Sequence, residues 1–373
     1  MNEAGEGGRP QIVPEALIRL PAWSVLVPVL GLGAWLVGSA GIGAAPVLLL
    51  VPLLVGCVIA AVHHAEVIAH RVGEPFGTLV LAVAVTVIEV SLIVSLMLSD
   101  TGDAATLARD TVVAAIMIIL NAMLGLCFLI GGLRHWEQRF TVAGVSAGLS
   151  TLAALAVLVL VLPNFTVTEP GAFYSPSQLV LVAIISLILY GTFVTVQTVR
   201  HRAYFLPSDE HAGASHALPP PSNRLAAGAF VTLLAALTAV IMLAKGIAPS
   251  VERAVLGAGL PLGVVAIVIA GMVLAPESLA AVRAARRNRL QTSINLAFGL
   301  ALATIGLTIP AVAIVSLLFG LPLALGVDVK TITLLALSLF VAAVGLSTGR
   351  TTVLQGMVHL VIFAVYLFTT IVP

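Results

Sequence analysis

Eleven long apolar stretches alternate with short polar segments along the chain. A helix of about 20 apolar residues is long enough to cross the hydrocarbon core of a bilayer. The pattern therefore predicts eleven membrane-spanning helices, at residues 22–40, 45–70, 75–98, 111–133, 141–162, 176–199, 225–244, 261–282, 294–318, 331–345 and 352–372. The predicted fold class is an all-α polytopic membrane protein.

The composition supports this class. Of the 373 residues, 60% are hydrophobic and only 9% are charged, and the mean hydropathy is +1.17. These values exclude a soluble domain, and no basic tract indicates nucleic acid binding. The two cysteines, Cys57 and Cys127, lie inside apolar runs. We therefore interpret them as packing residues and not as disulfide partners or metal ligands.

The basic residues predict the orientation in the membrane. With a cytoplasmic N-terminus, the inner segments hold thirteen of them and the outer loops hold four. Such an excess inside is typical of membrane proteins, so we expect the C-terminus to lie outside. The inner group is Arg9, Arg19, Arg71, Arg134, Arg139, Arg200, Arg202, Arg224, Arg283, Arg286, Arg287, Arg289 and Arg350, and the outer group is Arg109, Lys245, Arg253 and Lys330.

A weak internal repeat divides the chain. Glu66 is followed after eight residues by Pro75, and Glu252 is followed after eight residues by Pro261. Each copy then enters an apolar helix that carries a single acid. Five helices per copy is an odd number, so the two halves have opposite orientations in the membrane. The expected divisions are a cytoplasmic lead at 1–21, an extra helix at 22–40, a first repeat at 45–200, a cytoplasmic linker at 201–224 and a second repeat at 225–373.

The acids in these helices, Glu89 and Glu277, are the main functional candidates. A carboxylate inside a bilayer costs several kcal/mol, so such a residue indicates a functional site. Thr86 precedes Glu89 by three residues, and Pro276 before Glu277 removes the hydrogen bond to the Met272 carbonyl. Carboxylate, hydroxyl and carbonyl oxygens are ligands for hard cations. The alternative is a kinked helix with an ion-paired acid, but no Lys or Arg lies deep in a span.

The helices that follow each acid supply further polar candidates. These are Asn121 in the fourth span and Asn295, Thr304 and Thr308 in the ninth. Asn295 and Thr308 are thirteen residues apart, too far to share one site. For each threonine we favour a hydroxyl that bonds back to its own helix.

A second cluster, His63, Glu66 and His70, lies on one helix face at the cytoplasmic end of the second span. It indicates a proton relay or an entrance for cations, with a transition-metal site or solvated histidines as alternatives. The linker carries His211 and His216, where a Pro-stiffened solvated segment is favoured over a metal site.

The chain resembles the calcium:cation antiporter superfamily, in particular its bacterial Cha-type calcium/sodium:proton antiporters. The resemblance rests on two stretches, GEPFGTLVLAVAVTVIEVSLIVSLML and PESLAAVRAARRNRLQTSINLAFGLALATIGLTIP. It implies one extra helix plus two inverted five-helix repeats in a bacterial inner membrane. It also implies a cation site between Glu89 and Glu277, with Thr86, Ser278, Asn121 and Asn295 nearby, and a cytoplasmic approach shaped by Glu66 and Glu74.

The chain departs from the vacuolar calcium/proton members of that superfamily. Those members carry a Gly-Asn pair before each acid and a histidine after the second. Here Val85 and Thr86 precede Glu89, and Ser278 follows Glu277. The smaller number of side-chain amides leaves sodium and potassium as candidate cations beside calcium.

We therefore expect a secondary transporter that exchanges cytoplasmic Ca²⁺, and also Na⁺ or K⁺, for external protons by alternating access, without a cofactor. Alternatives are a monovalent cation:proton antiporter with little Ca²⁺ transport and an uncoupled cation channel or uniporter. An intramembrane enzyme is disfavoured, because no H-E-x-x-H, Ser/His pair or pair of aspartates lies at membrane depth. The expected partners are inorganic cations, protons and membrane lipid, and the sequence leaves the oligomeric state open.

Overall fold

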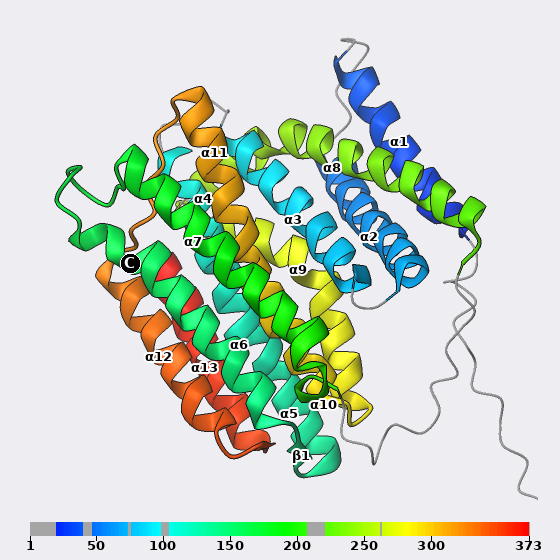
Figure 1. Cartoon of the computed structure of the whole chain (residues 1–373). Helices are drawn as coiled ribbons and strands as arrows, with labels where there is room; N and C mark the ends of the chain where they lie inside the picture. The colour runs from blue at the N-terminus through cyan, green and yellow to red at the C-terminus, as the bar shows by residue number, and fades with distance from the viewer. Residues whose placement is uncertain are drawn as a thin grey trace, which may run out of the picture.

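The computed structural model describes residues 20–39, 47–73, 76–97, 104–206, 221–261 and 263–372. Within these ranges the chain folds into a bundle of helices that run mostly alongside one another (Figure 1). The helices are α1 (Ala22–Ser39), α2 (Val47–Val72), α3 (Phe76–Met97), α4 (Ala104–Met117), α5 (Leu124–His135), α6 (Val142–Ala156), α7 (Pro176–Thr195), α8 (Asn223–Gly257), α9 (Gly263–Arg286), α10 (Leu290–Ala303), α11 (Ile309–Phe319), α12 (Val329–Leu346) and α13 (Val353–Ile371).

Short π-helical segments join or extend some of these helices. In a π-helix the backbone bonds reach one residue further than in an α-helix, and such segments occur frequently at functional sites. Two of them make α4–α5 and α10–α11 continuous. The segments are η2 (Ile118–Met123) between α4 and α5, η8 (Thr304–Thr308) between α10 and α11, η3 (Val157–Val161) with the 3₁₀ turn η4 (Leu162–Phe165) after α6, and η5 (Val196–Arg200) after α7, followed by the 3₁₀ turn η6 (Arg202–Tyr204).

The predicted polytopic all-α fold is confirmed, and every predicted span contains a helix. In the part of the chain that the structure describes, nine helices are long and apolar enough to cross a membrane, and α1 and α3 occupy the two remaining predicted spans. The largest difference is α8, which was predicted at 225–244 but continues to Gly257 over 35 residues. Lys245 and Arg253 end the apolar stretch, but polar side chains do not end a helix.

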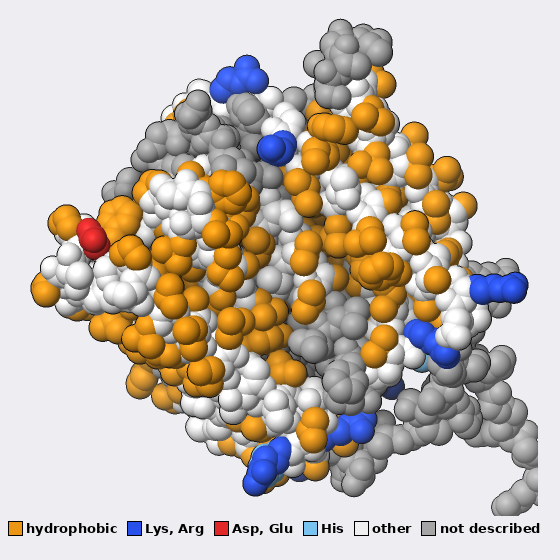
Figure 2. Space-filling model, turned by 45° about the horizontal axis from the view of Figure 1, so that its top comes forward, with side chains coloured by type: hydrophobic (Ala, Val, Ile, Leu, Met, Phe, Trp, Pro, Cys, Tyr) orange, Lys and Arg blue, Asp and Glu red, His pale blue; other side chains and the backbone are white. Residues whose placement is uncertain are grey.

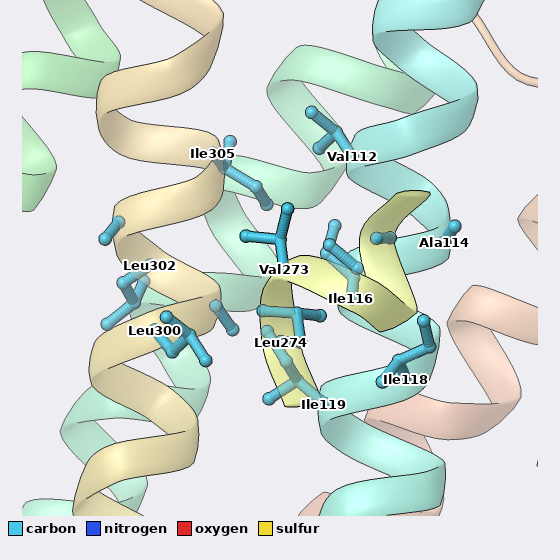
Figure 3. Close-up of a cluster of buried hydrophobic side chains, with 14 of the residues drawn as sticks. Val112, Ala114, Ile116, Ile118, Ile119, Val273, Leu274, Leu300, Leu302 and Ile305 are labelled. Carbon is cyan, nitrogen blue, oxygen red and sulfur yellow. The ribbon is translucent and has the colours of Figure 1, made fainter. Parts of the chain in front are cut away.

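The interior is a continuous apolar core. Figure 3 shows part of it, where α9 passes between the α4–η2 helix and the α10–η8 helix. Val273 and Leu274 of α9 lie there among Ile116, Ile119 and Ile305. As predicted, Cys57 and Cys127 are buried among apolar side chains and form no disulfide, and the Cys57 thiol donates to the Val27 carbonyl at 3.6 Å.

The outer surface is also largely apolar. Figure 2 shows hydrophobic side chains over most of the visible face, with Lys and Arg side chains mainly towards its margins. Large side chains such as Leu318, Phe340 and Leu354 are more than 60% exposed. A surface of this kind is suited to contact with lipid chains, and the protein is a multi-pass membrane protein.

Connections at both ends of the bundle are tied together by backbone hydrogen bonds. At one end, β1 (Gln138–Arg139) pairs antiparallel with β2 (Arg350–Thr351), which joins the α5–α6 loop to the α12–α13 loop. At the other end, the α11–α12 segment bonds to three different parts of the chain. The N–H groups of Ala324, Gly326 and Val327 donate to the carbonyls of Ala105, Ala172 and Leu160.

Close contact between α5 and α13 requires glycine at position 356. A Cβ atom at Gly356 would lie 2.8 Å from the Gly125 carbonyl oxygen and would also overlap the Leu129 backbone. We expect Gly356→Ala to lower the free energy of unfolding by about 1–3 kcal/mol, the usual cost of overpacking. Thermal unfolding in detergent measures this effect. Gly191→Ala is the matched control, because nothing lies within 4 Å of its added Cβ, and an equal loss in both variants would contradict the close contact.

Candidate functional site

Glu89 is held in the core by two hydroxyl groups. It is the fourteenth of the 22 residues of α3, and its side chain is only 6% exposed. Its Oε2 accepts hydrogen bonds from Thr308 Oγ1 at 3.1 Å and from Thr304 Oγ1 at 3.3 Å. Its Oε1 is buried and has no hydrogen-bond partner among the described residues. The expectation that Thr304 and Thr308 bond back to their own helix was therefore wrong.

The π-helix η8 presents these two hydroxyls to α3. Thr304 and Thr308 are its first and last residues, so both ends of the segment contact the same carboxylate. Between them lies Gly306, where an added Cβ would be 2.6 Å from the Cβ of Tyr190 in α7. The missing side chain thus lets α7 pack directly on η8. Sequence reasoning named both threonines but did not connect them to Glu89, although their spacing of four residues is compatible with one shared partner.

Glu277 is buried without comparable support. It is the fifteenth of the 24 residues of α9, directly after Pro276, and is 5% exposed. Neither of its carboxylate oxygens has a hydrogen-bond partner among the described residues. The helix α2, which carries Glu66, packs against α9. Ser278, the next residue, is half-buried.

Neither acid forms an ion pair with Arg or Lys in the part of the chain that the structure describes. In the described ranges, the ion pairs with Arg or Lys join Arg109 to Asp110 and Glu137 to Arg139 and Arg350, none of which involves Glu89 or Glu277. The helices α3 and α9 pack against each other, and the core around them is apolar (Figure 3). A carboxylate that has lost water without gaining a counter-charge is strongly destabilised. A bound cation or a proton removes that cost.

Asn121 takes part in a different network. Its Nδ2 donates to Ser338 Oγ of α12 at 2.8 Å, and its Oδ1 lies 3.2 Å from His359 Nδ1 of α13. Because an amide oxygen only accepts, the Nδ1 of His359 carries a proton in this contact. All three side chains are at most 1% exposed. Sequence reasoning missed His359, although a histidine inside an apolar span was a visible signal.

Asn295 also has partners away from the two acids. Its Nδ2 donates to the Phe205 carbonyl at 2.5 Å, and its Oδ1 accepts from Gln291 Nε2 at 2.8 Å. These contacts join α10 to the segment that follows α7. Thr86, in contrast, is buried on α3 one turn before Glu89, as its spacing predicted.

The second predicted cluster, His63, Glu66 and His70, lies on α2, where His63 and its neighbour His64 contact α1. His64 is fully buried and its Nε2 lies 3.0 Å from the Ser24 carbonyl, while the ring of His63 lies 5.8 Å from that of Trp23. His70 is half-buried and Glu66 is exposed. In the described ranges, no group of three His, Cys, Asp or Glu side chains is arranged to hold a metal ion. Glu74, like His211 and His216, lies outside the described residues.

Known proteins with a similar sequence were found. The protein y4hA of Sinorhizobium fredii, provisionally named as an ionic transporter, is 48% identical over 359 residues, which are 95% of this chain and 97% of that protein. The sodium-potassium/proton antiporter ChaA of Escherichia coli is 38% identical over 313 residues, 83% of this chain and 84% of ChaA. The Ca²⁺/H⁺ antiporter of Aphanothece halophytica is 26% identical over 286 residues, 72% of this chain and 76% of that protein.

Solved structures share the fold. The structure of native YfkE superposes with a TM-score of 0.70 at 16% identity and covers 94% of this chain and 100% of that one. Over residues 43–199 and 228–372, the sequence matches the family described as sodium/calcium exchanger protein. That family consists of transporters and not of enzymes. The match extends over most of both halves, and the chain belongs to the sodium/calcium exchanger protein family.

Proposed function

We propose that this chain exchanges cations for protons across the membrane and that Glu89 and Glu277 bind them. The observation that carries the proposal is the burial of two carboxylates, each near the middle of its helix, without an Arg or Lys partner in the described ranges. Family membership supports an ion transporter. The names of the relatives from E. coli and A. halophytica support exchange against protons.

Coupling follows from competition for the same carboxylates. An empty site with two unpaired negative charges is the most costly state in an apolar core. Binding of one divalent cation, of monovalent cations or of protons neutralises it. A change of access from one side of the membrane to the other is therefore favourable with either cargo and unfavourable with none, so that inward proton movement drives cation export.

The two acids have different roles in this proposal. Thr304 and Thr308 fix one oxygen of Glu89 and leave the other for the cargo. Their hydroxyl oxygens also suit a hard cation, as do those of Thr86 and Ser278. Glu277 has two unpartnered oxygens, so we assign it the larger movement when the cargo changes. Asn121 and Asn295 become ligands only if they leave the partners described above.

The chain is proposed to consist of an extra helix, 22–40, and two inverted repeats, 45–200 and 225–373. Gly77 and Gly263 are 186 residues apart, and the π-helices η2 and η8 begin at Ile118 and Thr304, which are also 186 residues apart. Contacts are reciprocal as well, because α3 packs on α10–η8–α11 and α9 packs on α4–η2–α5. These features support two copies of one unit.

Orientation and substrate remain part of the proposal. We place the protein in a bacterial inner membrane with the N-terminus in the cytoplasm, and we assign His63, Glu66 and His70 to the cytoplasmic entrance. Ca²⁺ is the expected cation, with Na⁺ and K⁺ as alternatives. The packing of α2, which carries Glu66, against α9 supports an approach along α2 to the second acid.

Everted vesicles test the exchange directly. Vesicles acidified inside and loaded with a pH-quenched dye receive Ca²⁺, Na⁺ or K⁺ separately between pH 7 and 9. Dequenching on addition of a cation reports its exchange for protons and ranks the three cations. We expect Glu89→Gln and Glu277→Gln to reduce dequenching to the level of vesicles without the protein, because neither variant forms the doubly charged site.

Glu169→Gln is the control for these variants, since Glu169 is an exposed loop residue between η4 and α7. It is expected to retain exchange. Membrane content of each variant is measured by immunoblot, so that failed insertion is recognised. Full exchange in either site variant would contradict the assignment of that acid. Cation uptake without dequenching in the unmodified protein would indicate a channel or uniporter.

Removal of the two hydroxyls tests the support of Glu89. We expect the double variant Thr304→Val, Thr308→Val to raise the apparent KM for the cation roughly tenfold or more, because a hydrogen bond to a charged group contributes about 1.5–3 kcal/mol. The same dequenching assay measures KM. The control is Thr238→Val, whose hydroxyl bonds back to the Leu234 carbonyl. An unchanged KM in the double variant would mean that these hydroxyls do not support the transporting state.

A further inference from the structure

The strand pair at one end of the bundle brings two arginines together. In the β1–β2 register, Arg139 lies directly opposite Arg350. Like charges in directly opposite positions destabilise an antiparallel pair. Glu137 offsets only part of this charge, since a single oxygen lies 3.4 Å from Arg139 Nε and 3.6 Å from Arg350 Nη1. Both guanidinium groups are mostly exposed and keep further N–H donors for another anion.

Neighbouring loops add positive charge to the same end. The Arg286 carbonyl lies 3.1 Å from His135 Nε2, and the Ala285 carbonyl accepts from Gln138 Nε2 at 2.9 Å. These contacts tie the end of α9 to the end of α5 and to β1. Glu137 is the single acidic residue in segments 134–141, 286–289 and 347–352, all of which the structure describes. Together they hold six arginines: Arg134, Arg139, Arg286, Arg287, Arg289 and Arg350.

An exposed tryptophan, Trp136, lies three residues before Arg139 in the same α5–α6 connection. Trp136 follows the last residue of α5 with a φ of 66°, a backbone conformation that costs a tryptophan about 1–3 kcal/mol. Its side chain is 88% exposed, and Leu133 one turn earlier is 70% exposed. Exposed tryptophan next to arginine at the ends of apolar helices is typical of the membrane–water interface. A soluble anion offers no reason for this apolar neighbour.

We propose that Arg139 and Arg350, together with Trp136 and Leu133, form a binding site for the phosphate of an anionic phospholipid. Guanidinium groups bind phosphate through paired N–H donors. The indole ring of Trp136 is suited to the depth in the bilayer at which the lipid glycerol backbone lies. Orientation rules explain the number of arginines at this end but not their direct opposition across a strand pair. The bound lipid would bridge the α5–α6 and α12–α13 loops. This site is independent of the proposed ion exchange.

Fluorescence quenching by brominated lipid tests the site. The chain has three tryptophans, so replacing Trp23 and Trp35 by Phe leaves Trp136 as the single emitter. This protein is reconstituted in phosphatidylcholine vesicles with a rising share of brominated phosphatidylglycerol or brominated phosphatidylcholine. We expect half-maximal quenching at a mole fraction of the anionic lipid about fivefold lower or more, since each arginine near an anionic surface contributes about a fivefold preference.

Two variants with equal loss of charge distinguish a site from general attraction. Arg139→Gln with Arg350→Gln should abolish the preference, whereas Arg287→Gln with Arg289→Gln should retain it. Equal quenching by both lipids in the single-tryptophan protein that retains Arg139 and Arg350 would overturn the proposal. An equal loss of the lipid preference in both double variants would also overturn it. Loss of the preference on addition of inorganic phosphate would also overturn it, because the site would then bind a soluble anion. All four arginines are exposed, and gel-filtration profiles confirm that the variants fold.

Discussion

Burial of carboxylates in an apolar core without a basic partner is the constraint on which the rest of the site depends. The cost of an unpaired charge at membrane depth is several kcal/mol, a large fraction of the stability of a domain. Around Glu89 the structure reduces this cost with two threonine hydroxyls, a π-helix that presents them and a glycine that admits Tyr190 behind them. None of these features neutralises the carboxylate. In the proposed site, the remaining cost favours the binding of a mobile cation or proton.

The two proposed repeats agree in the placement of their π-helices but differ in the side chains that these segments carry. At the 186-residue spacing of the repeats, the positions that match Thr304 and Thr308 are Ile118 and Ala122. Ile118 belongs to the apolar cluster in Figure 3, and Asn121, which is adjacent to Ala122, bonds to α12 and α13. Among the residues that the structure describes, no hydroxyl donates to Glu277 as Thr304 and Thr308 donate to Glu89. If the two acids of an inverted repeat differ in their hydrogen bonds, the proposed site can have different affinities for cation and proton when it opens to one side of the membrane and to the other. An exactly symmetric site would have the same affinities on both sides.

Sequence reasoning succeeded where a single strong physical term dominates. Hydrocarbon thickness fixes the length of apolar stretches, so all predicted spans contain helices, and the burial of Glu89 and Glu277 was predictable from their positions inside such stretches. It failed where the result depends on how helices pack. Whether Thr308 reaches its own helix or Glu89 depends on the register of α10–α11 against α3. The partners of Asn295 depend in the same way on the segment after α7. The overrun of α8 reflects a further limit, because the end of an apolar stretch marks the membrane surface and not the end of the helix.

The ties at the ends of the bundle constrain how access changes. β1 of the first half pairs with β2 of the second, and the Val327 N–H of the second half donates to the Leu160 carbonyl of the first. Rotation of one entire half against the other would break hydrogen bonds at both ends at once. The helices α1, α2 and α8 form a layer on one side of the bundle (Figure 1), joined by the contacts of His64 with Ser24 and of Arg71 with Asn223. Movement of this layer, which carries Glu66, would leave the end ties intact, and we therefore favour it as the change of access in the proposed exchange.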